Sequence, residues 1–328
     1  MTRTRAETAL ERIVLAYSGD LESSIAIPWL AERHRAEIIT VTMDLGQGKE
    51  LLEEVRDRSL ATGALRAHVV DIRDEFARGY IVRALKAGFL GGAGAPTQAV
   101  LRRPLVAQKL VTIAHIEQAT AVAHGVAGAH AAHMETTVRS LDPMLTVLAP
   151  GDEWAMTAAQ QADYARQRGV AVPAAGAFDD RSARARPQPD LPDEAASVDI
   201  AFERGVPIVI NGVVMPLLDL FGSLDIIAGA HGVDRVAALH AAHEALQRST
   251  LDEHAAAFSA LVAEQYRRIL RDGLWFAPMR EALDAYVDKI QERVAGVVRL
   301  KLLKGECTVV DCKVIASPPT FIALTKAH

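Results

Sequence analysis

The sequence predicts an α/β protein built on a doubly wound parallel sheet, followed by a second, smaller α+β domain. Three observations predict this class. Apolar runs that suit buried strands alternate with stretches of helical periodicity in the first half of the chain. Several of these runs end in a glycine or a short polar loop, as parallel βαβ units do. After residue 197 the pattern changes to short alternating strands and helices.

The first elements follow one plan. The run "IVLAYSG" stays apolar until it closes in Ser-Gly, as expected of a strand buried on both faces, and residues 22–33 then have helical spacing. The segment "AEIITVTMDLGQG" repeats the plan with Asp44 at its end, and "LLEEVRDRSLATGA" predicts the next helix. The segment "RAHVVDI" predicts a third strand, with a helix to about Ala87.

The next elements complete the predicted sheet. A helix is expected to begin at Pro104 in "PLVAQKLVTIAHIEQA", and "TAVAHG" predicts a strand that ends in His124-Gly125. The segments "LTVLAP" and "TAAQQADYARQRG" predict one more strand and helix. Ligands of such sheets bind beyond the carboxyl ends of the strands. We therefore expect the loops that carry Ser18, Asp44 and His124 to meet in one crevice.

A change of composition marks the predicted domain boundary. Residues 179–197 are rich in Pro, Arg and Asp and lack apolar periodicity, which is typical of an exposed linker. We expect a nucleotide-binding type of α/β domain over residues 1–172, a linker over 173–197 and an α+β domain over 198–328.

The second domain is expected to combine antiparallel strands with helices. The segment "VDIAFERGVPIVINGVV" predicts strands around two glycine turns. An Ala-rich helical stretch is expected from Val233 to about Leu270, and "PMREALDAYVDKIQERVAG" predicts another helix. The segment "VVRLKLLKGECTVVDCKVIA" predicts a final hairpin that turns at Lys304-Gly305.

Composition argues against several classes of function. The chain has 328 residues, a net charge of −5 and dispersed basic residues, which argues against nucleic-acid binding. Neither a signal peptide nor a membrane-spanning run is visible, so we expect a cytoplasmic protein that does not bind membranes. The two cysteines, Cys307 and Cys312, make neither a disulfide framework nor a complete metal site.

Several segments resemble one family, the argininosuccinate synthases, which belong to the PP-loop superfamily of N-type ATP pyrophosphatases. The stretch "VLAYSGDLESS" is similar to the family's "VLAYSGGLDTS", and the likeness continues through "DLGQG", "RPLVAQKLV" and "AHG". Later, "HGVDRV", "GLWFAPMREALDAYV" and "GVVRLKLLKG" resemble its second domain. The resemblance implies an adenine nucleotide alpha hydrolase-like fold. It also implies an ATP-dependent C–N ligase that joins citrulline to aspartate with ATP and Mg²⁺ and releases AMP and pyrophosphate.

The resemblance implies an ATP site at the ends of the first strands. Its residues would be Ala16, Tyr17, Ser18, Gly19, Asp20, Glu22, Ser23, Ser24, Met43, His124 and Gly125. The loop departs from the family at Asp20, which replaces a glycine, and at Glu22, which replaces an aspartate. A carboxylate about 4 Å from a phosphate charge costs roughly 4 kcal/mol at an effective dielectric of about 20 unless a cation intervenes. Asp20 and Glu22 therefore either recruit magnesium, or Asp20 only caps the following helix.

The same resemblance implies that the clamps for citrulline and aspartate have lost their polar groups. The family's clamp positions correspond here to Ala95, Ala99, Val100, Ala127, Ala129, Ala131, Ala132, Glu135 and Ala155. Glu135 replaces an arginine, which reverses the sign of its interaction with a substrate carboxylate. A site for two zwitterions needs several convergent charges, so we expect no argininosuccinate synthesis.

Two functions remain open. The first is a retargeted ligase that still binds ATP and adenylates a different, less polar substrate. The second is a non-catalytic homologue that binds a protein partner, in a specialised biosynthetic pathway. The pattern His130-x2-His133-x-Glu135 either binds zinc or iron, if it is helical, or lies in a solvated loop.

The end of the sequence bears on assembly. The C-terminal helix through which the family forms tetramers has no counterpart, and Pro318-Pro319 is followed by an apolar "TFIAL". We expect this tail to fold back or to dock on a second subunit, and we expect a homodimer rather than a tetramer.

Overall fold

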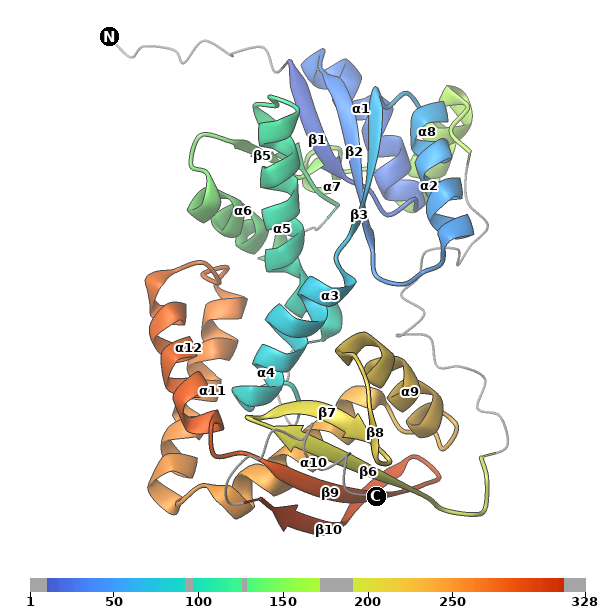
Figure 1. The fold of residues 1–328 in the computed structure, drawn as a ribbon. Helices are drawn as coiled ribbons and strands as arrows, with labels where there is room; N and C mark the ends of the chain where they lie inside the picture. The colour runs from blue at the N-terminus through green and yellow to red at the C-terminus, as the bar shows by residue number, and fades with distance from the viewer. Residues whose placement is uncertain (1–10, 92–96, 126–128, 172–190, 316–328) are drawn as a thin grey trace. The chain divides into compact units, whose positions relative to one another are not determined.

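A computed structural model shows two compact units (Figure 1). It describes residues 11–91, 97–125, 129–171 and 191–315. The first unit comprises residues 1–73, 103–184 and 272–276. The second comprises residues 74–102, 185–271 and 277–328. Most of the expected linker, and the tail with Phe321, lie outside the described residues.

The first unit contains a five-stranded parallel sheet of strand order β3-β2-β1-β4-β5. Its strands are β1 (Arg12–Ala16), β2 (Glu37–Asp44), β3 (Arg66–Asp71), β4 (Ala121–Ala123) and β5 (Thr146–Leu148). Val14 of β1 lies between Ile39 of β2 and Val122 of β4, so the strand order reverses beside β1. This topology confirms the predicted doubly wound parallel sheet.

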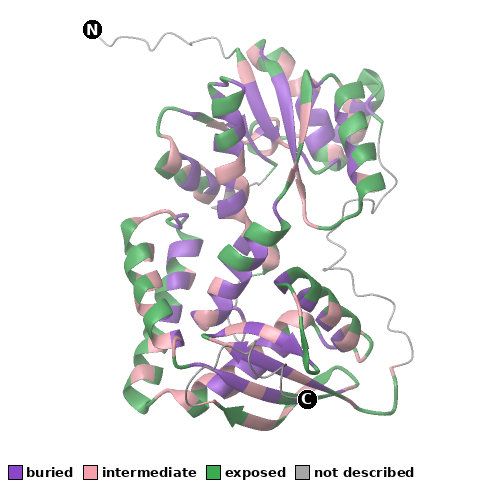
Figure 2. Ribbon diagram, in the orientation of Figure 1, coloured by how far each residue is buried: buried purple, intermediate pink, exposed green. Residues whose placement is uncertain are grey.

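Helices cover both faces of this sheet. They are α1 (Leu21–His34), α2 (Lys49–Ala61), α5 (Gln98–Ile116), α6 (Ala129–Leu141), α7 (Pro150–Glu153) and α8 (Ala158–Arg168). Ile13 and Leu15 of β1 point into a core with α1 and α2, whereas Val14 points into a core with α5 and α6. The strand is therefore buried on both faces, as Figure 2 shows in purple.

One expectation for this part of the chain is wrong, and one open alternative is decided. Helix α5 begins at Gln98 and carries Pro104 in its interior, because Thr97 already caps it by accepting the Val100 amide at 3.3 Å. The proline only leaves one carbonyl without its helical donor. Of the two alternatives for residues 130–135, the helical one holds: they lie in helix α6, because Met134 and Val138 pack into the core of the sheet.

The second unit contains a five-stranded antiparallel sheet of order β10-β9-β6-β7-β8. Its strands are β6 (Ala196–Glu203), β7 (Val206–Ile210), β8 (Val213–Val214), β9 (Gly296–Leu303) and β10 (Glu306–Val314). In β9, Val298, Leu300 and Leu302 are buried and alternate with exposed Arg299 and Lys301. The predicted strands and final hairpin are thereby confirmed.

Helices pack against this sheet and against one another. They are α4 (Val82–Lys86), α9 (Leu217–Gly229), α10 (Arg235–Thr250), α11 (Glu253–Arg271) and α12 (Pro278–Gln291). A short α3 (Arg73–Phe76) and a π-helical turn η1 (Ala77–Ile81) precede α4, where one regular helix was expected.

The Ala-rich stretch is not one helix. It breaks between α10 and α11, where the Asp252 carboxylate accepts the Ala255 amide at 2.9 Å and starts a new helix. Helix α9 was not predicted. None of the helices that the structure describes is both long enough and apolar enough to cross a membrane.

Candidate functional site

The loop between β1 and α1 holds most of the residues assigned to an ATP site. Gly19 has a φ of 79°, which lets the chain turn sharply before the helix. Asp20 is the N-cap of α1, and its Oδ1 accepts the Ser23 amide at 2.7 Å. Its Oδ2 accepts the Ser18 hydroxyl at 2.8 Å. Both oxygens of Asp20 are therefore engaged by the loop itself, which matches the capping alternative for this residue.

The serines of this loop face one another. The Ser18 hydroxyl lies 3.1 Å from the Ser23 hydroxyl, which in turn donates to the Asp20 carbonyl at 3.3 Å. Deeper in the unit, Tyr17 and Ser24 are buried, and their hydroxyls are hydrogen-bonded at 3.0 Å. Burial raises the pKa of Tyr17, and the hydrogen bond with Ser24 opposes this shift. The buried hydrogen bond between Tyr17 and Ser24 thus joins the end of β1 to the first turn of α1.

The loop between β1 and α1 is also bound by a cation that the sequence does not indicate. Arg58 of α2 donates from Nη1 to the Gly19 carbonyl at 2.9 Å, and its side chain is 11% exposed. The same guanidinium pairs with Glu54 one turn away. No local signal marks Arg58, because it lies 39 residues from Gly19 in the sequence.

The loop after β2 is ordered by its own side chains. Asp44 Oδ1 accepts the Gly46 amide at 2.7 Å. Gln47 accepts the Leu45 amide at 2.6 Å and donates to the Met43 carbonyl at 2.9 Å. Helix α2 then begins after Gly48 with no side-chain cap. Ala16 and Met43, both assigned to ATP, are half-buried against the core of the sheet.

The structure brings four of the predicted residues around one small cavity. Glu22, Ser23, His124 and Gly125 line a space of about 10 Å³ together with Leu15, Ala26, Pro150, Gly151 and Trp154. This volume suits about one water molecule. His124 is buried, and its backbone amide donates to the Leu148 carbonyl at 3.2 Å. The start of α1 and the loop after β4 therefore meet at this cavity, whereas Ser18 and Asp44 are not among its lining residues, and the space is small.

The predicted clamp positions fall into two groups. Ala99 and Val100 lie on α5 in the part assigned to the second unit, and Ala131, Ala132 and Glu135 lie on α6 in the first. Ala131 is buried and Ala132 is exposed. Glu135 forms an ion pair with Arg139 on its own helix at 2.6 Å. Ala95 and Ala127, and the side chains of Ala129 and His130, lie outside the described residues.

Helix α6 is fixed by a close contact. The Thr137 hydroxyl donates to the His133 carbonyl at 2.8 Å and lies 3.1 Å from the Gly273 carbonyl. Gly273 has a φ of 73°, and a Cβ there would lie 2.5 Å from the His133 carbonyl. Within the part of the chain that the structure describes, no three His, Cys, Asp or Glu side chains gather as metal ligands.

The residues at the start of α1 do not fit an ATP phosphate in this arrangement. A phosphate at a helix start accepts backbone amides and nearby hydroxyls. Here the Asp20 carboxylate already accepts the Ser23 amide and the Ser18 hydroxyl, and its negative charge opposes a second anion. A phosphate would have to displace Asp20 or reach the loop with a cation between the two.

Comparisons with known proteins agree on one family. A model of the argininosuccinate synthase N-terminal HUP domain matches residues 12–171. A model of the C-terminal domain of the same synthase matches residues 171–239 and 236–317. The parallel sheet is therefore of the adenine nucleotide alpha hydrolase-like class that the sequence predicts.

Curated relatives agree with these models. The argininosuccinate synthase of Geobacillus thermodenitrificans is 35% identical over 350 residues, covering 91% of this chain and 85% of its own. That of Rubrobacter xylanophilus is 37% identical over the same shares of both chains. The solved structure of an NMN synthetase from Francisella tularensis is 15% identical, with a TM-score of 0.30, over 49% of this chain and 63% of its own.

Proposed function

The chain belongs to the argininosuccinate synthase family, and within this family we propose that it does not make argininosuccinate and serves as a non-catalytic binding subunit. The single observation that carries this proposal is the position of the Asp20 carboxylate. It accepts the Ser23 amide in the first turn of α1 and the Ser18 hydroxyl, so a carboxylate occupies the donors that a nucleotide phosphate would need.

The clamp positions support the same proposal. Ala131 and Ala132 have no side-chain donor, and the Glu135 carboxylate is paired with Arg139 of the same helix. By resemblance to the family, these positions should hold polar or cationic groups toward the two amino acids. A pocket that lacks them leaves the charges of both substrates without partners.

The first experiment measures the family reaction. The protein is incubated with ATP, magnesium, citrulline and aspartate, and pyrophosphate is measured. We expect no release that depends on both amino acids. Release that requires both of them would contradict the proposal.

The second experiment measures ATP binding by calorimetry with magnesium. Asp20→Asn keeps a capping oxygen but removes the charge, and Asp20→Gly removes both. We expect ATP affinity to rise at least about tenfold in the order parent, Asp20→Asn, Asp20→Gly, because a nearby like charge is removed. Glu22→Gln removes the other carboxylate assigned to this site, so it shows whether the effect on ATP affinity belongs to Asp20 alone. If Asp20→Asn binds ATP more weakly than the parent, Asp20 serves as a ligand on the magnesium side.

A retargeted ligase is the second candidate, and three features of the loop other than Asp20 support it. Gly19 keeps the positive φ that allows a backbone to approach a ligand closely, and Ser18 is exposed beside it. Arg58 adds a cation that is hydrogen-bonded to the Gly19 carbonyl. This candidate requires ATP binding by the unaltered protein. Its test is pyrophosphate release on addition of carboxylic acids that lack citrulline's ureido group.

Partners and assembly are part of the proposal. A binding subunit requires a protein partner, and we expect the chain itself to form a homodimer, because two-fold dimers are the commonest soluble homo-oligomers. Light scattering on the full chain measures this state. A monomer or a tetramer would contradict it. The cytoplasmic location stays a prediction.

A further inference from the structure

The second unit carries a charged depression that the site described above does not use. Its volume is about 440 Å³, within the range of small-molecule sites. Its lining residues come from α4, from the β6–β7 turn and its flank, and from α12 and its C-cap: Lys86, Arg204, Val206, Ala285, Asp288, Lys289 and Glu292. All of these belong to the second unit.

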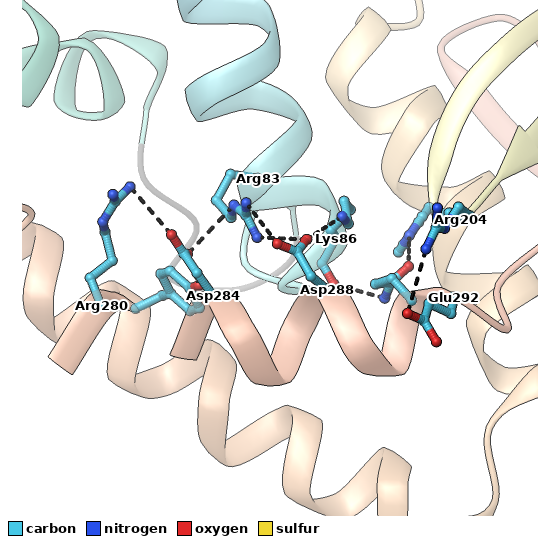
Figure 3. A network of polar contacts seen from close by, with 10 residues as sticks. Arg83, Lys86, Arg204, Arg280, Asp284, Asp288 and Glu292 are labelled. Carbon is cyan, nitrogen blue, oxygen red and sulfur yellow. Dashed lines mark hydrogen bonds and ion pairs between the residues drawn. The ribbon is translucent and has the colours of Figure 1, made fainter. Parts of the chain in front are cut away.

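One face of α12 carries a row of carboxylates. Asp284, Asp288 and Glu292 are spaced four residues apart, so they lie one above another on the helix (Figure 3). Asp288 accepts hydrogen bonds from Arg83 at 3.0 Å and from Lys86 at 2.5 Å. The row therefore attracts cations from α4, a helix about two hundred residues away in the sequence.

Glu292 is shared by two cations at the edge of the depression. Lys289 donates to it at 2.9 Å and Arg204 at 3.4 Å. The side chains of Lys289 and Arg204 are 80% and 62% exposed, so both remain accessible to a ligand. The hydrogen bond from Lys289 lowers the pKa of Glu292, which therefore stays ionised.

Cations outnumber carboxylates among the residues that line the depression. The charged residues that line it are Lys86, Arg204 and Lys289 on the cationic side, and Asp288 and Glu292 on the anionic side. Burial raises the pKa of Asp288, but the hydrogen bonds from Lys86 and Arg83 outweigh it and lower the pKa overall. The local charge is therefore positive, and an added anion would balance it.

The turn that carries Arg204 is held in one conformation. Arg204 and Gly205 have φ values of 52° and 74°, and the Gly205 amide donates to the Val294 carbonyl at 2.8 Å. A Cβ on Gly205 would lie 2.0 Å from Oε1 of Gln291. Gln291 is itself held, because it donates to the Lys86 carbonyl at 2.9 Å. The guanidinium is thus attached to a rigid support.

We propose that this depression binds a small organic anion whose charged end is a carboxylate or a phosphate. The charged end lies between Arg204 and Lys289 and takes the place of Glu292 as their partner. The remainder of the ligand rests on the apolar side chains of Val206 and Ala285. Arg204 suits this role because its planar guanidinium binds either group with two parallel hydrogen bonds.

The test is calorimetric titration of the full chain at constant ionic strength, with sodium succinate in one arm and inorganic phosphate in the other. We expect saturable binding of at least one anion, and the two arms separate a carboxylate site from a phosphate site. Arg204→Asn should weaken it about tenfold or more, since it removes a charged donor. Asparagine tolerates the left-handed conformation of the turn.

Lys304→Asn is the matched control. Lys304 also precedes a glycine in a two-residue hairpin turn of the same unit, with a φ of 48°, and lies outside the depression. It should bind the anion as the parent does. Equal weakening by both substitutions would show a general charge effect and overturn the proposal, as would the lack of saturable binding in both arms.

A third variant tests the direction of the effect. Glu292→Gln removes the carboxylate that competes with the ligand, so it should tighten binding several-fold. Weaker binding by Glu292→Gln would overturn the proposal. These measurements do not involve ATP, so their failure is independent of the function proposed for the loop at Asp20.

Discussion

Two glycine turns of this protein place a charged residue beside a left-handed glycine and use the charge in opposite ways. Asp20 follows Gly19 in the first unit, and its partners lie only two and three residues away. Arg204 precedes Gly205 in the second unit, and its partner Glu292 lies 88 residues away. In the Asp20 turn the carboxylate accepts an amide at the start of its own helix, whereas in the Arg204 turn the guanidinium is exposed to solvent. A charged residue beside a left-handed glycine can therefore either fill the binding groups of its own loop or remain available to a ligand. Which of the two occurs depends on whether its partner is a neighbour in the sequence or a distant residue.

The largest expected effect comes from the glycine of the Arg204 turn. Gly205→Ala introduces a Cβ 2.0 Å from Gln291 Oε1 at a φ of 74°. We expect the free energy of unfolding to fall by about 4 kcal/mol, from overpacking and from the left-handed backbone together. Urea unfolding of the full chain measures it.

Gly212→Ala provides the control for this substitution. Gly212 has a φ of 79° in a similar hairpin turn, but nothing lies within 4 Å of its Cβ position. It should lose only about 1–2 kcal/mol from the backbone. Equal losses at Gly205 and Gly212 would mean that the Arg204 turn is not held against Gln291.

A pH effect is expected next in size, in the support of the same turn. His243 of α10 is fully buried, and its Nε2 donates to Gln291 Oε1 at 3.0 Å. Burial lowers the pKa of His243 to about 4, and the hydrogen bond with Gln291 opposes this shift. The groups that face it are Gln291, the Phe202 ring, and the charges of His240 and Lys86.

The sign follows from proton uptake on unfolding. Between pH about 6.5 and pH about 4, the unfolded chain protonates this histidine and the folded chain does not. The free energy of unfolding should therefore fall as pH drops through this window, by about 3 kcal/mol in all, and should be unaffected by His243 above it. His243→Gln keeps a donor but does not titrate, so its stability should depend less on pH. Parallel pH profiles for parent and variant would contradict this account.

The Asp20 turn should show a smaller change in stability. Asp20→Ala removes the N-cap of α1 and should lower the free energy of unfolding by about 1 kcal/mol. Asp20→Asn should leave it almost unchanged, because asparagine caps as well as aspartate does. Thermal unfolding at neutral pH compares the two variants. A large loss in Asp20→Asn would show that the negative charge, and not the cap, is what this loop requires.

The sequence predicted those parts of the fold whose signals are local. Strands β1 and β2 are apolar because both faces are buried. The turn at Lys304-Gly305 is indicated by its glycine. Helix α9 was missed although its buried residues recur at helical spacing, because the exposed Leu218 and Ile226 add apolar residues outside that buried set. The start at Pro104 was wrong because the cap of α5 is Thr97, seven residues earlier.

The same rule applies to the candidate sites. The cap by Asp20 was foreseen as one of two alternatives, because its partners are neighbours in the sequence. The depression was not foreseen, because Lys86, Arg204 and Asp288 are far apart in the chain and meet only in the folded unit. Arg58 was missed for the same reason.

The smallest expected effect separates binding from support at the second turn. Arg204 is 62% exposed and lies 3.4 Å from Glu292, which keeps Lys289 as a partner. Arg204→Asn should therefore change the free energy of unfolding by no more than about 0.5 kcal/mol, as should Lys304→Asn, because exposed ion pairs contribute little. Urea unfolding of both variants beside the parent measures this. A variant that loses anion binding without losing stability identifies Arg204 as a ligand contact. A loss above about 1 kcal/mol in Arg204→Asn alone would instead make this arginine a structural support, and the contrast with Asp20 would fail.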